Sequence, residues 1–386
     1  QARGEGSYLV GNDRAPSVDS LKSRSKPNAL TQNLSHKGAA LQTFLFTGAS
    51  GYIGSHTAFW FLTQRQDCQI VIYDNLSTGF RQNYEYIASI FGDRVRFVQG
   101  DVGDTQNLSK LMERERFSGV VHFAASLIVS ESVAIPLAYY KNNTLNTTLL
   151  IDLCIKHGIN TFIFSSTAAV YGEPDVSLVP VSESIPLDPI NPYGASKMMS
   201  ERVLMDTHRA YGQFNYAILR YFNVAGASSA NTLEILESAQ GLGQRSKNAT
   251  HLIKVACECA CGMREGMSVF GRDYETKDGT CVRDYIHVDD LASAHLSALT
   301  YLEQHNKSEV FNVGYGHGYS VLEVIEMVKK VSGVDFKVLD SARRAGDPTI
   351  LIADNTKICT LTDWKPHFDD LAYIVKSAYE WEKYAK

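Results

Sequence analysis

Short apolar runs alternate with longer amphipathic stretches from residue 43 onward, and this alternation is the strongest pattern in the chain. Runs of this length separated by helical segments indicate βαβ units, whose parallel strands are buried on both faces. The pattern therefore predicts an α/β fold with a doubly wound parallel sheet of the Rossmann type. The expected strands are Thr43–Thr47, Ile70–Tyr73, Val95–Val98, Val120–Phe123, Thr161–Phe164 and Ala217–Tyr221.

The rhythm becomes irregular after about residue 227, where long polar loops surround a helix expected near residues 250–263. We therefore expect a dinucleotide-binding domain over residues 43–227 and a smaller, mainly substrate-binding C-terminal lobe over residues 228–386. Some elements of that lobe are expected to return to the first domain. Residues 1–42 are rich in Ser, Asn, Gly and basic residues, so we expect a flexible tail or a remnant of processing or expression.

Composition narrows the classes of partner. Hydrophobic residues make up 44% of the chain, and no run approaches the roughly 20 apolar residues of a membrane span. A net charge of −5 provides no basic surface for nucleic acid or an anionic membrane. The seven cysteines are scattered, and Cys257, Cys259 and Cys261 lack a partner pair at metal-ligand spacing. We expect a cytoplasmic protein without a metal site.

A glycine-rich turn follows the first expected strand, with Gly48, Gly51 and Gly54 before a helical stretch. Glycines here permit a tight turn and a close approach of backbone N–H groups to a pyrophosphate. Asp74 ends the second strand 20 residues beyond Gly54. Its carboxylate would accept hydrogen bonds from a ribose and would repel a 2′-phosphate, which favours NAD over NADP. Asp101, at the end of the third strand, is expected near the adenine.

Tyr193 and Lys197 are four residues apart in a helical stretch and therefore share a helix face. They follow the fifth expected strand, which ends in Ser165-Ser166-Thr167. A phenol of pKa about 10 is a poor base at pH 7, and a neighbouring ammonium and a cationic nicotinamide would favour its phenolate. Tyr193 is thus the candidate base, with Lys197 tuning it and Thr167 orienting or relaying the proton.

From about Thr43 to the C-terminus, the chain resembles the extended short-chain dehydrogenases/reductases, and among them the UDP-glucose 4-epimerases. The resemblance rests on six motifs, of which the last is highly specific. They are Gly48-Ala-Ser-Gly-Tyr-Ile-Gly-Ser-His56, Tyr139-Tyr-Lys-Asn-Asn143, Phe164-Ser-Ser-Thr-Ala-Ala-Val-Tyr-Gly172, Asn191-Pro-Tyr-Gly-Ala-Ser-Lys197, Leu219-Arg-Tyr-Phe-Asn-Val-Ala-Gly226 and Asp278-Gly-Thr-Cys-Val-Arg-Asp-Tyr-Ile-His-Val288.

The resemblance implies epimerisation at C4 of a UDP-hexose. Tyr193 would take the C4 hydroxyl proton while hydride passes to tightly held NAD. The 4-keto sugar would then swing about its diphosphate and receive the hydride on its other face. The implied cofactor contacts are Gly48, Gly51, Tyr52, Ile53, Gly54, Asp74, Asn75, Asp101, Val102, Phe123, Ala124, Ala125, Asn142, Tyr193, Lys197 and Tyr221. The resemblance also implies a homodimer formed through helices of the first domain.

The implied substrate contacts are Thr167, Tyr193, Phe222, Asn223, His251, Leu252, Arg283, Tyr285, Arg344 and Asp347. Guanidinium groups suit a diphosphate because they combine charge with a forked set of donors. Many relatives have a Lys in a Phe-Ala-Gly-Leu-Lys segment, whereas this chain reads Phe123-Ala-Ala-Ser-Leu-Ile-Val129. Leu351 stands where, in the family, Tyr disfavours N-acetyl sugars and a small residue admits them. Acceptance of 2-acetamido sugars is therefore left open.

Alternative functions would require different residues at this site. A 4,6-dehydratase would need an Asp-Glu pair after Thr167, where this chain has Ala168-Ala169. A decarboxylase of UDP-glucuronate, or a 4-epimerase of UDP-pentoses or UDP-uronates, would differ in a few pocket residues only. A non-catalytic nucleotide-binding protein would not need to retain the Thr167, Tyr193 and Lys197 set.

Overall fold

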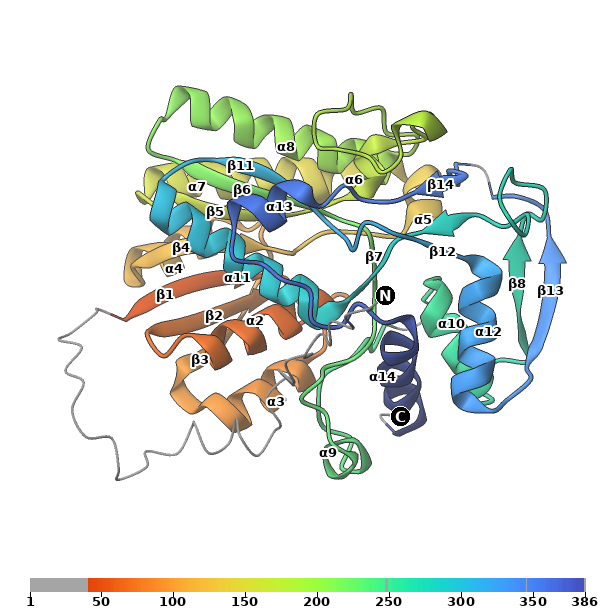
Figure 1. Cartoon of the computed structure of the whole chain (residues 1–386). Helices are drawn as coiled ribbons and strands as arrows, with labels where there is room; N and C mark the ends of the chain where they lie inside the picture. The colour runs from red at the N-terminus through yellow and green to blue at the C-terminus, as the bar shows by residue number, and fades with distance from the viewer. Residues whose placement is uncertain (1–40, 247–248, 345, 385–386) are drawn as a thin grey trace, which may run out of the picture.

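The computed structural model describes residues 41–246, 249–344 and 346–384. Its main feature is a sheet of seven parallel strands in the order β11-β6-β5-β4-β1-β2-β3 (Figure 1). The strands are β1 (Gln42–Thr47), β2 (Cys68–Asp74), β3 (Val95–Gln99), β4 (Phe117–His122), β5 (Thr161–Thr167), β6 (Asn215–Tyr221) and β11 (Glu309–Val313).

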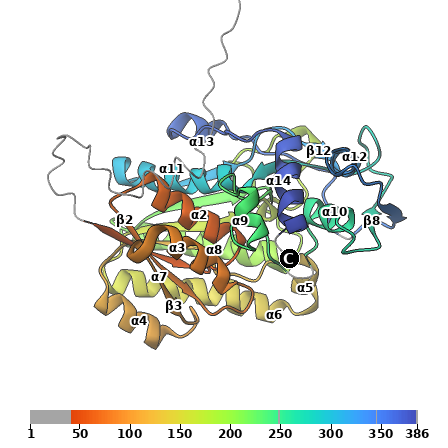
Figure 2. The ribbon, with the colours of Figure 1, turned by 90° about the horizontal axis from the view of Figure 1, so that it is seen from below.

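Helices cover both faces of this sheet, which is why its central strands are buried almost without interruption. One face packs against α2 (Tyr52–Gln64), α3 (Arg81–Phe91) and α11 (Val288–His305). The other packs against α4 (Thr105–Arg114), α7 (Asn146–Lys156) and α8 (Pro192–Ala210). Figure 2 shows α4 and α7 on one side of the strands and α11 on the other. The predicted doubly wound parallel sheet is confirmed.

The strand order places the functional end of the sheet. After β3 the chain returns to the other side of β1 to form β4, so loops leave β1 and β4 in opposite directions. A crevice forms at the carboxyl ends of the strands at such a point, and ligands of open α/β sheets bind there. Predicted site residues lie at the carboxyl ends of β1 to β6 or in the segments that directly follow these strands.

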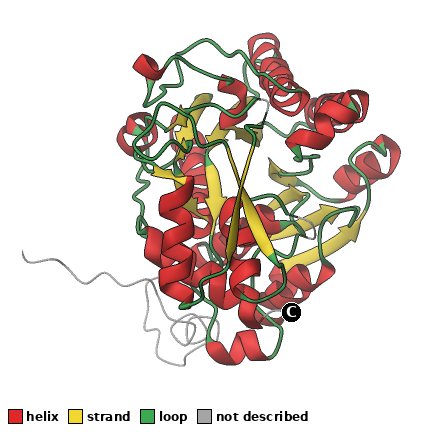
Figure 3. Cartoon of the chain, turned by 90° about the vertical axis from the view of Figure 1, so that its right-hand side faces the viewer, coloured by secondary structure: helices red, strands yellow, loops and turns green. Residues whose placement is uncertain are grey.

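The second lobe consists of short strands and three packed helices (Figures 1 and 3). Its strand pairs are β8 (Gly266–Phe270) with β13 (Lys337–Ser341), β7 (Asn223–Ala225) with β10 (Tyr285–His287), and β9 (Val282–Arg283) with both β12 (Tyr319–Ser320) and β14 (Ile350–Leu351). The helices α10 (Leu252–Ala260), α12 (Val321–Ser332) and α14 (Leu371–Tyr384) contact one another. Among the described residues, no helix is long and apolar enough to cross a membrane.

Shorter elements connect these parts. They are α5 (Val129–Ala134), α6 (Pro136–Tyr139), the π-helix η2 (Tyr140–Leu145), α9 (Leu233–Glu237), α13 (Thr356–Leu361), and the 3₁₀ turns η1 (Gly92–Arg94), η3 (Ala168–Tyr171) and η4 (Val176–Leu178).

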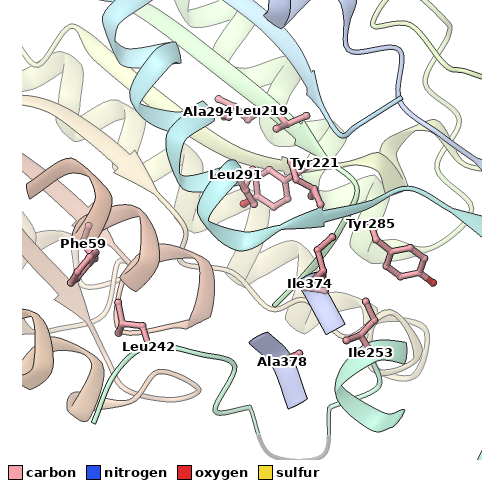
Figure 4. Packing of buried hydrophobic residues seen from close by; sticks show 14 of the residues in the cluster. Phe59, Leu219, Tyr221, Leu242, Ile253, Tyr285, Leu291, Ala294, Ile374 and Ala378 are labelled. Carbon is pink, nitrogen blue, oxygen red and sulfur yellow. The ribbon is translucent and has the colours of Figure 1, made fainter. Parts of the chain in front are cut away.

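One apolar cluster runs through both lobes. It contains Phe59 of α2, Leu242 of the connecting segment, Ile253 of α10 and Ile374 of α14 (Figure 4). β11 also crosses the predicted division at residue 227, because it pairs with β6 in the main sheet. The two-domain division stays a prediction, and the two parts share their core.

Candidate active site

Two positions in the turn after β1 and the first turn of α2 accept no residue larger than glycine. Gly48 has a φ of +72°, and a Cβ added there would lie 2.4 Å from the backbone N of Ala124. A Cβ added at Gly54 would lie 2.5 Å from the Cα of Ala49. The first glycine therefore lets the turn touch the loop after β4, and the second lets α2 pack closely against the turn.

The first turn of α2 supplies no anion of its own to the N-terminus of the helix. Its N-cap, Gly51, offers no side-chain hydrogen bond, and the first turn contains no acidic residue. The Tyr52 hydroxyl donates to the Gly226 carbonyl at 2.6 Å, so this side chain is engaged away from the helix end. The N–H groups of the first turn, including those of Tyr52 and Ile53, carry the positive end of the helix dipole. This cradle fits a pyrophosphate.

Asp74 lies buried at the end of β2, beside the same turn. Its Oδ2 accepts from Ser50 N at 2.9 Å and its Oδ1 accepts from Leu76 N at 2.8 Å. Burial raises the pKa of this carboxyl group, while the two backbone donors act in the opposite direction. The hydrogen bonds fix the carboxylate at the crevice, in the position that the sequence assigns to a ribose acceptor.

The next strand end brings Asn75 and Asp101 together. Asn75 Nδ2 donates to Asp101 Oδ2 at 2.7 Å, and Gly103 N donates to the other carboxylate oxygen at 2.7 Å. Val102 is buried beside them. The predicted adenosine contacts thus form a continuous rim along β2 and β3.

The loop after β4 is fastened to the π-helix η2. Asn143 is buried; its Oδ1 accepts from Ser126 N at 2.8 Å, and its Nδ2 donates to Ser126 O at 2.9 Å and Ser196 Oγ at 3.0 Å. The neighbouring Asn142 Nδ2 donates to Ser126 Oγ at 2.9 Å. These bonds hold the loop that begins Phe123-Ala124-Ala125 against the helix that carries the predicted catalytic residues.

The predicted catalytic residues meet at the end of β5. Helix α8 begins with Asn191 as N-cap and Pro192 at its first position, which places Tyr193 in the first turn. Lys197 Nζ donates to Ser165 O at 2.8 Å. Burial raises the pKa of Tyr193, and its hydrogen bond with the Thr167 hydroxyl acts in the opposite direction. Burial also lowers the pKa of the Lys197 ammonium to about 7.

This arrangement holds a neutral phenol in the protein alone. A positive charge brought next to Tyr193 would favour the phenolate and make it a base. Tyr221, predicted to contact the cofactor, is buried with its hydroxyl against Ser165 Oγ; burial raises the pKa of its phenol, and a charged Tyr193 would raise it further. If Tyr193 is the proton acceptor, its basicity would depend on a cation bound beside it.

Four predicted substrate residues line one pocket, which is bounded by β7, β10, α10 and α14. Asn223 of β7 pairs with Tyr285 of β10, and both line the pocket together with His251 and Leu252 at the start of α10. His251 Nδ1 lies 2.9 Å from Gln244 Nε2, so the imidazole is oriented by a neighbouring amide.

The two predicted arginines lie on the second lobe, at different contacts. Arg283 is buried on β9, and its Nη2 is 3.8 Å from Asp347 Oδ1. The Arg344 guanidinium lies over the Phe270 ring, 3.7 Å from its centroid. The structure thus brings Arg283 and Asp347 together and gives Arg344 an aromatic partner.

Leu351 belongs to an apolar cluster that includes Ala168, the residue after Thr167. It is buried on β14 with Phe222, which follows β6, and with Ala168, which follows Thr167. A larger side chain at position 351 would have to enter the space between these residues.

Comparisons with known proteins show the family to which the chain belongs. Residues 44–314 match the NAD dependent epimerase/dehydratase family. The chain belongs to this family. A curated member, the UDP-glucose 4-epimerase of Azospirillum brasilense, is 45% identical over 347 residues, which are 89% of this chain and 93% of the relative.

Two solved structures of the NAD dependent epimerase/dehydratase fold are also similar over nearly their whole length. The UDP-Glc/GlcNAc 4-epimerase of Campylobacter jejuni is 55% identical with a TM-score of 0.75, covering 89% of this chain and 99% of that one. The UDP-glucose-4-epimerase of Stenotrophomonas maltophila, with bound NAD and formylated UDP-arabinopyranose, is 35% identical with a TM-score of 0.81. That match covers 88% of this chain and 98% of the other.

The structure also shows contacts near the site that the sequence motifs do not predict. Phe270 belongs to none of the sequence motifs, and only the structure shows that the Arg344 guanidinium lies over its ring. Asn143 follows the predicted Asn142 in the sequence. Its hydrogen bonds from the π-helix η2 connect Ser126, in the loop after β4, to Ser196 of α8. In place of the lysine of many relatives, Leu127 is half exposed, and the backbone of Ser126 is held by Asn143.

Proposed function

We propose that this enzyme interconverts UDP-galactose and UDP-glucose as an NAD-dependent UDP-glucose 4-epimerase. The observation that supports the proposal is that Tyr193, Thr167 and the buried Lys197 come together at the end of β5. A nucleotide-binding protein without catalysis would not need a buried lysine one helical turn from a tyrosine that hydrogen-bonds to Thr167.

The residues present fit NAD. The pyrophosphate would lie at the N-terminus of α2, and Asp74 would accept from the adenosine ribose. Lys197 would hold the nicotinamide ribose, as the resemblance implies. When bound, NAD supplies reversible hydride chemistry at C4 of the sugar, which allows a 4-keto sugar to form and be reduced on either face.

The chain's own groups move the proton and hold the substrate. Tyr193 takes the C4 hydroxyl proton as hydride leaves C4 and returns it at the end, with the Thr167 hydroxyl orienting the oxygen. Arg283 and Arg344 bind the diphosphate, which is the part of the substrate that stays fixed while the sugar turns. Since Leu351, Phe222 and Ala168 present apolar surfaces, the turning sugar meets few hydrogen bonds that would trap one orientation.

A direct assay tests this function. Purified protein is incubated with UDP-galactose without added cofactor, and the products are separated by chromatography. We expect UDP-glucose to form until equilibrium, because the cofactor is restored in each turnover. No conversion, even after NAD is added, would refute the proposal and favour UDP-pentose or UDP-uronate substrates.

Asp74→Ala is expected to weaken NAD binding about 10- to 100-fold. The variant loses hydrogen bonds between a charged carboxylate and the ribose, each worth about 1.5–3 kcal/mol. Cofactor content of the purified variant, measured after denaturation, would report the loss. Asp104→Ala is a control at a helix N-cap on the same edge of the sheet. Equal cofactor content in Asp74→Ala and the unmodified protein would show that the ribose lies elsewhere.

We also propose that the enzyme accepts UDP-N-acetylhexosamines. Two observations support this: Leu351 is shorter than the tyrosine that the resemblance associates with exclusion, and the Campylobacter jejuni relative is a UDP-Glc/GlcNAc 4-epimerase. Leu351→Tyr is expected to reduce kcat/KM for UDP-N-acetylgalactosamine at least tenfold, about 1.4 kcal/mol, while that for UDP-galactose changes much less. Leu351→Met, of nearly equal volume, is the control. Equal losses for both sugars would contradict a role for residue 351 in selecting the 2-substituent.

Competing chemistry lacks support at the site. Ala168 is buried in the apolar cluster, so the acid and base of a 4,6-dehydratase are missing beside Thr167.

A homodimer through the first domain is supported by exposed apolar side chains on its outer helices, among them Leu137, Leu145 and Met199. We place the enzyme in the cytoplasm on the scattered distribution of its cysteines.

A further inference from the structure

A buried ion pair lies directly behind the catalytic residues. The side chains of Glu201 on α8 and Arg220 on β6 are 1% and 4% exposed. Arg220 Nη2 donates to Glu201 Oε2 at 2.6 Å, and Arg220 Nε donates to Oε1 at 3.0 Å, so the pair is bidentate. Neither residue belongs to the site residues predicted from the sequence.

The pair is built from the immediate neighbours of the catalytic groups. Glu201 lies one helical turn after Lys197 on α8. Ser166, which precedes Thr167, pairs with Arg220 in the β5–β6 register, and its hydroxyl donates to Glu201 Oε1 at 2.5 Å. A single carboxylate therefore ties α8 to the ends of both strands that carry the site.

Arg220 extends the connection to the third strand of this edge. Its Nη1 donates to the Tyr171 hydroxyl at 3.1 Å and to the Glu183 carbonyl at 3.3 Å. The Tyr171 hydroxyl donates in turn to Asn312 Oδ1 of β11 at 2.5 Å. The guanidinium and carboxylate are thus surrounded by hydrogen bonds, which a buried pair requires.

Stability alone does not account for such a pair. Apolar residues of similar volume often replace a buried ion pair with no loss of stability, because desolvating two charges is expensive. What apolar residues cannot provide is a negative charge one turn from Lys197. That ammonium is buried, its pKa is lowered to about 7, and the Glu201 carboxylate acts to raise it.

Other titratable groups around Lys197 do not supply this charge. Tyr193 is on the same helix, Tyr139 lies on α6 and Tyr221 on β6, and burial keeps all three phenols neutral by raising their pKa. His122 on β4 is buried with its pKa lowered to about 3, so it is neutral as well. Glu201 is the carboxylate whose charge acts on Lys197 among these groups.

We propose that Glu201, held by Arg220 and Ser166, is a positioning residue that fixes α8 against β5 and β6 and balances the charge of Lys197. The proposal deepens the proposed function, because a charged Lys197 is needed to tune Tyr193. It concerns Lys197 in the protein itself, so it can be tested without turnover.

The first test is the titration of Lys197, followed by NMR of protein labelled with ¹³C at lysine Cε and assigned by the signal lost in Lys197→Met. In Glu201→Gln, which keeps the shape and removes the charge, we expect the pKa of Lys197 to fall by about one unit. The double variant Glu201→Gln/Arg220→Met also removes the unpaired buried guanidinium and serves if the single variant does not fold. An unchanged Lys197 titration in a folded variant would overturn the proposal.

The second test is the pH profile of kcat for UDP-galactose. Loss of the charged Lys197 should begin about one pH unit lower in the variant, so that kcat falls about tenfold at pH 8 with KM nearly unchanged. Glu303→Gln, which breaks an ion pair with Arg65 at the far end of α2, is the control and should shift neither measurement. An identical pH profile with a uniformly lower kcat would indicate a structural role only and overturn the proposal. If the unmodified enzyme lacked epimerase activity, the proposed function would fail, while the NMR titration would still decide the role of Glu201.

Discussion

Tyr193→Phe is expected to lower kcat for UDP-galactose by about a thousandfold. General acid–base catalysis by a positioned side chain contributes roughly 10²- to 10⁴-fold, and phenylalanine keeps the ring while it removes the proton acceptor. The phenol has the Thr167 hydroxyl as its hydrogen-bond partner, and phenylalanine offers no group that could accept the proton in its place. Chromatography of the products over long incubations would measure the residual rate.

Two further measurements separate catalysis from folding in this variant. Cofactor content and thermal stability should match those of the unmodified protein, because the ring still packs in place. Tyr211→Phe, at an exposed tyrosine after the same helix, is the matched control and should retain full activity. A Tyr193→Phe enzyme with a rate near that of Tyr211→Phe would show that another group takes the proton.

Gly48→Ala is expected to abolish NAD retention and to reduce stability by several kcal/mol. The added Cβ would lie 2.4 Å from Ala124 N and 2.5 Å from Ala124 Cα, which are backbone atoms that cannot rotate away. The residue also has a φ of +72°, which costs an L side chain roughly 1–2 kcal/mol. The turn and the loop after β4 must move apart, and both are predicted to contact the cofactor.

Gly158→Ala isolates the effect of contact from that of backbone strain. Gly158 has a φ of +68°, close to that of Gly48, but a Cβ there would meet nothing within 4 Å. We expect this control to lose about 1 kcal/mol and to keep its NAD. Thermal unfolding and cofactor content of both variants give the comparison. Similar losses in the two variants would mean that the close approach of the turn and the loop is not required.

The strands that the sequence predicts are those with continuous apolar runs. β1, β2, β4, β5 and β6 are mostly buried, so their burial appears directly in the sequence as Val, Ile and Phe, and the edge strand β3 keeps an apolar run although it is less buried. The sequence does not predict β11 because Glu309-Val-Phe-Asn-Val313 is short and includes a polar Asn312. The Asn312 amide is satisfied by Val181, Asp354 and Tyr171, which belong to other segments. Its partner strand lies far away in sequence, and hydrophobic periodicity carries no information about pairing.

The site residues also fall into those that the sequence predicts and those that it does not. Residues in motifs, such as Gly48 and Tyr193, can be predicted because one local geometry requires them. Phe270 cannot be predicted, because its contact with Arg344 joins the end of β8 to the loop after β13, two segments that local patterns leave unrelated. The Glu201–Arg220 pair cannot be predicted for the same reason. A Glu in a helix and an Arg in a strand are usually surface residues, and only the fold shows that these two are buried together.

The position of β11 has a consequence for synthesis of the protein on the ribosome. Residues 309–313 complete the main sheet beside β6, so a growing chain that has released β6 must wait for most of the second lobe before that edge is covered. Until then the N–H and C=O groups of β6 can pair with strands of other chains. Pauses in translation between residues 221 and 309 should therefore promote aggregation of nascent chains, whereas pauses after residue 313 should not.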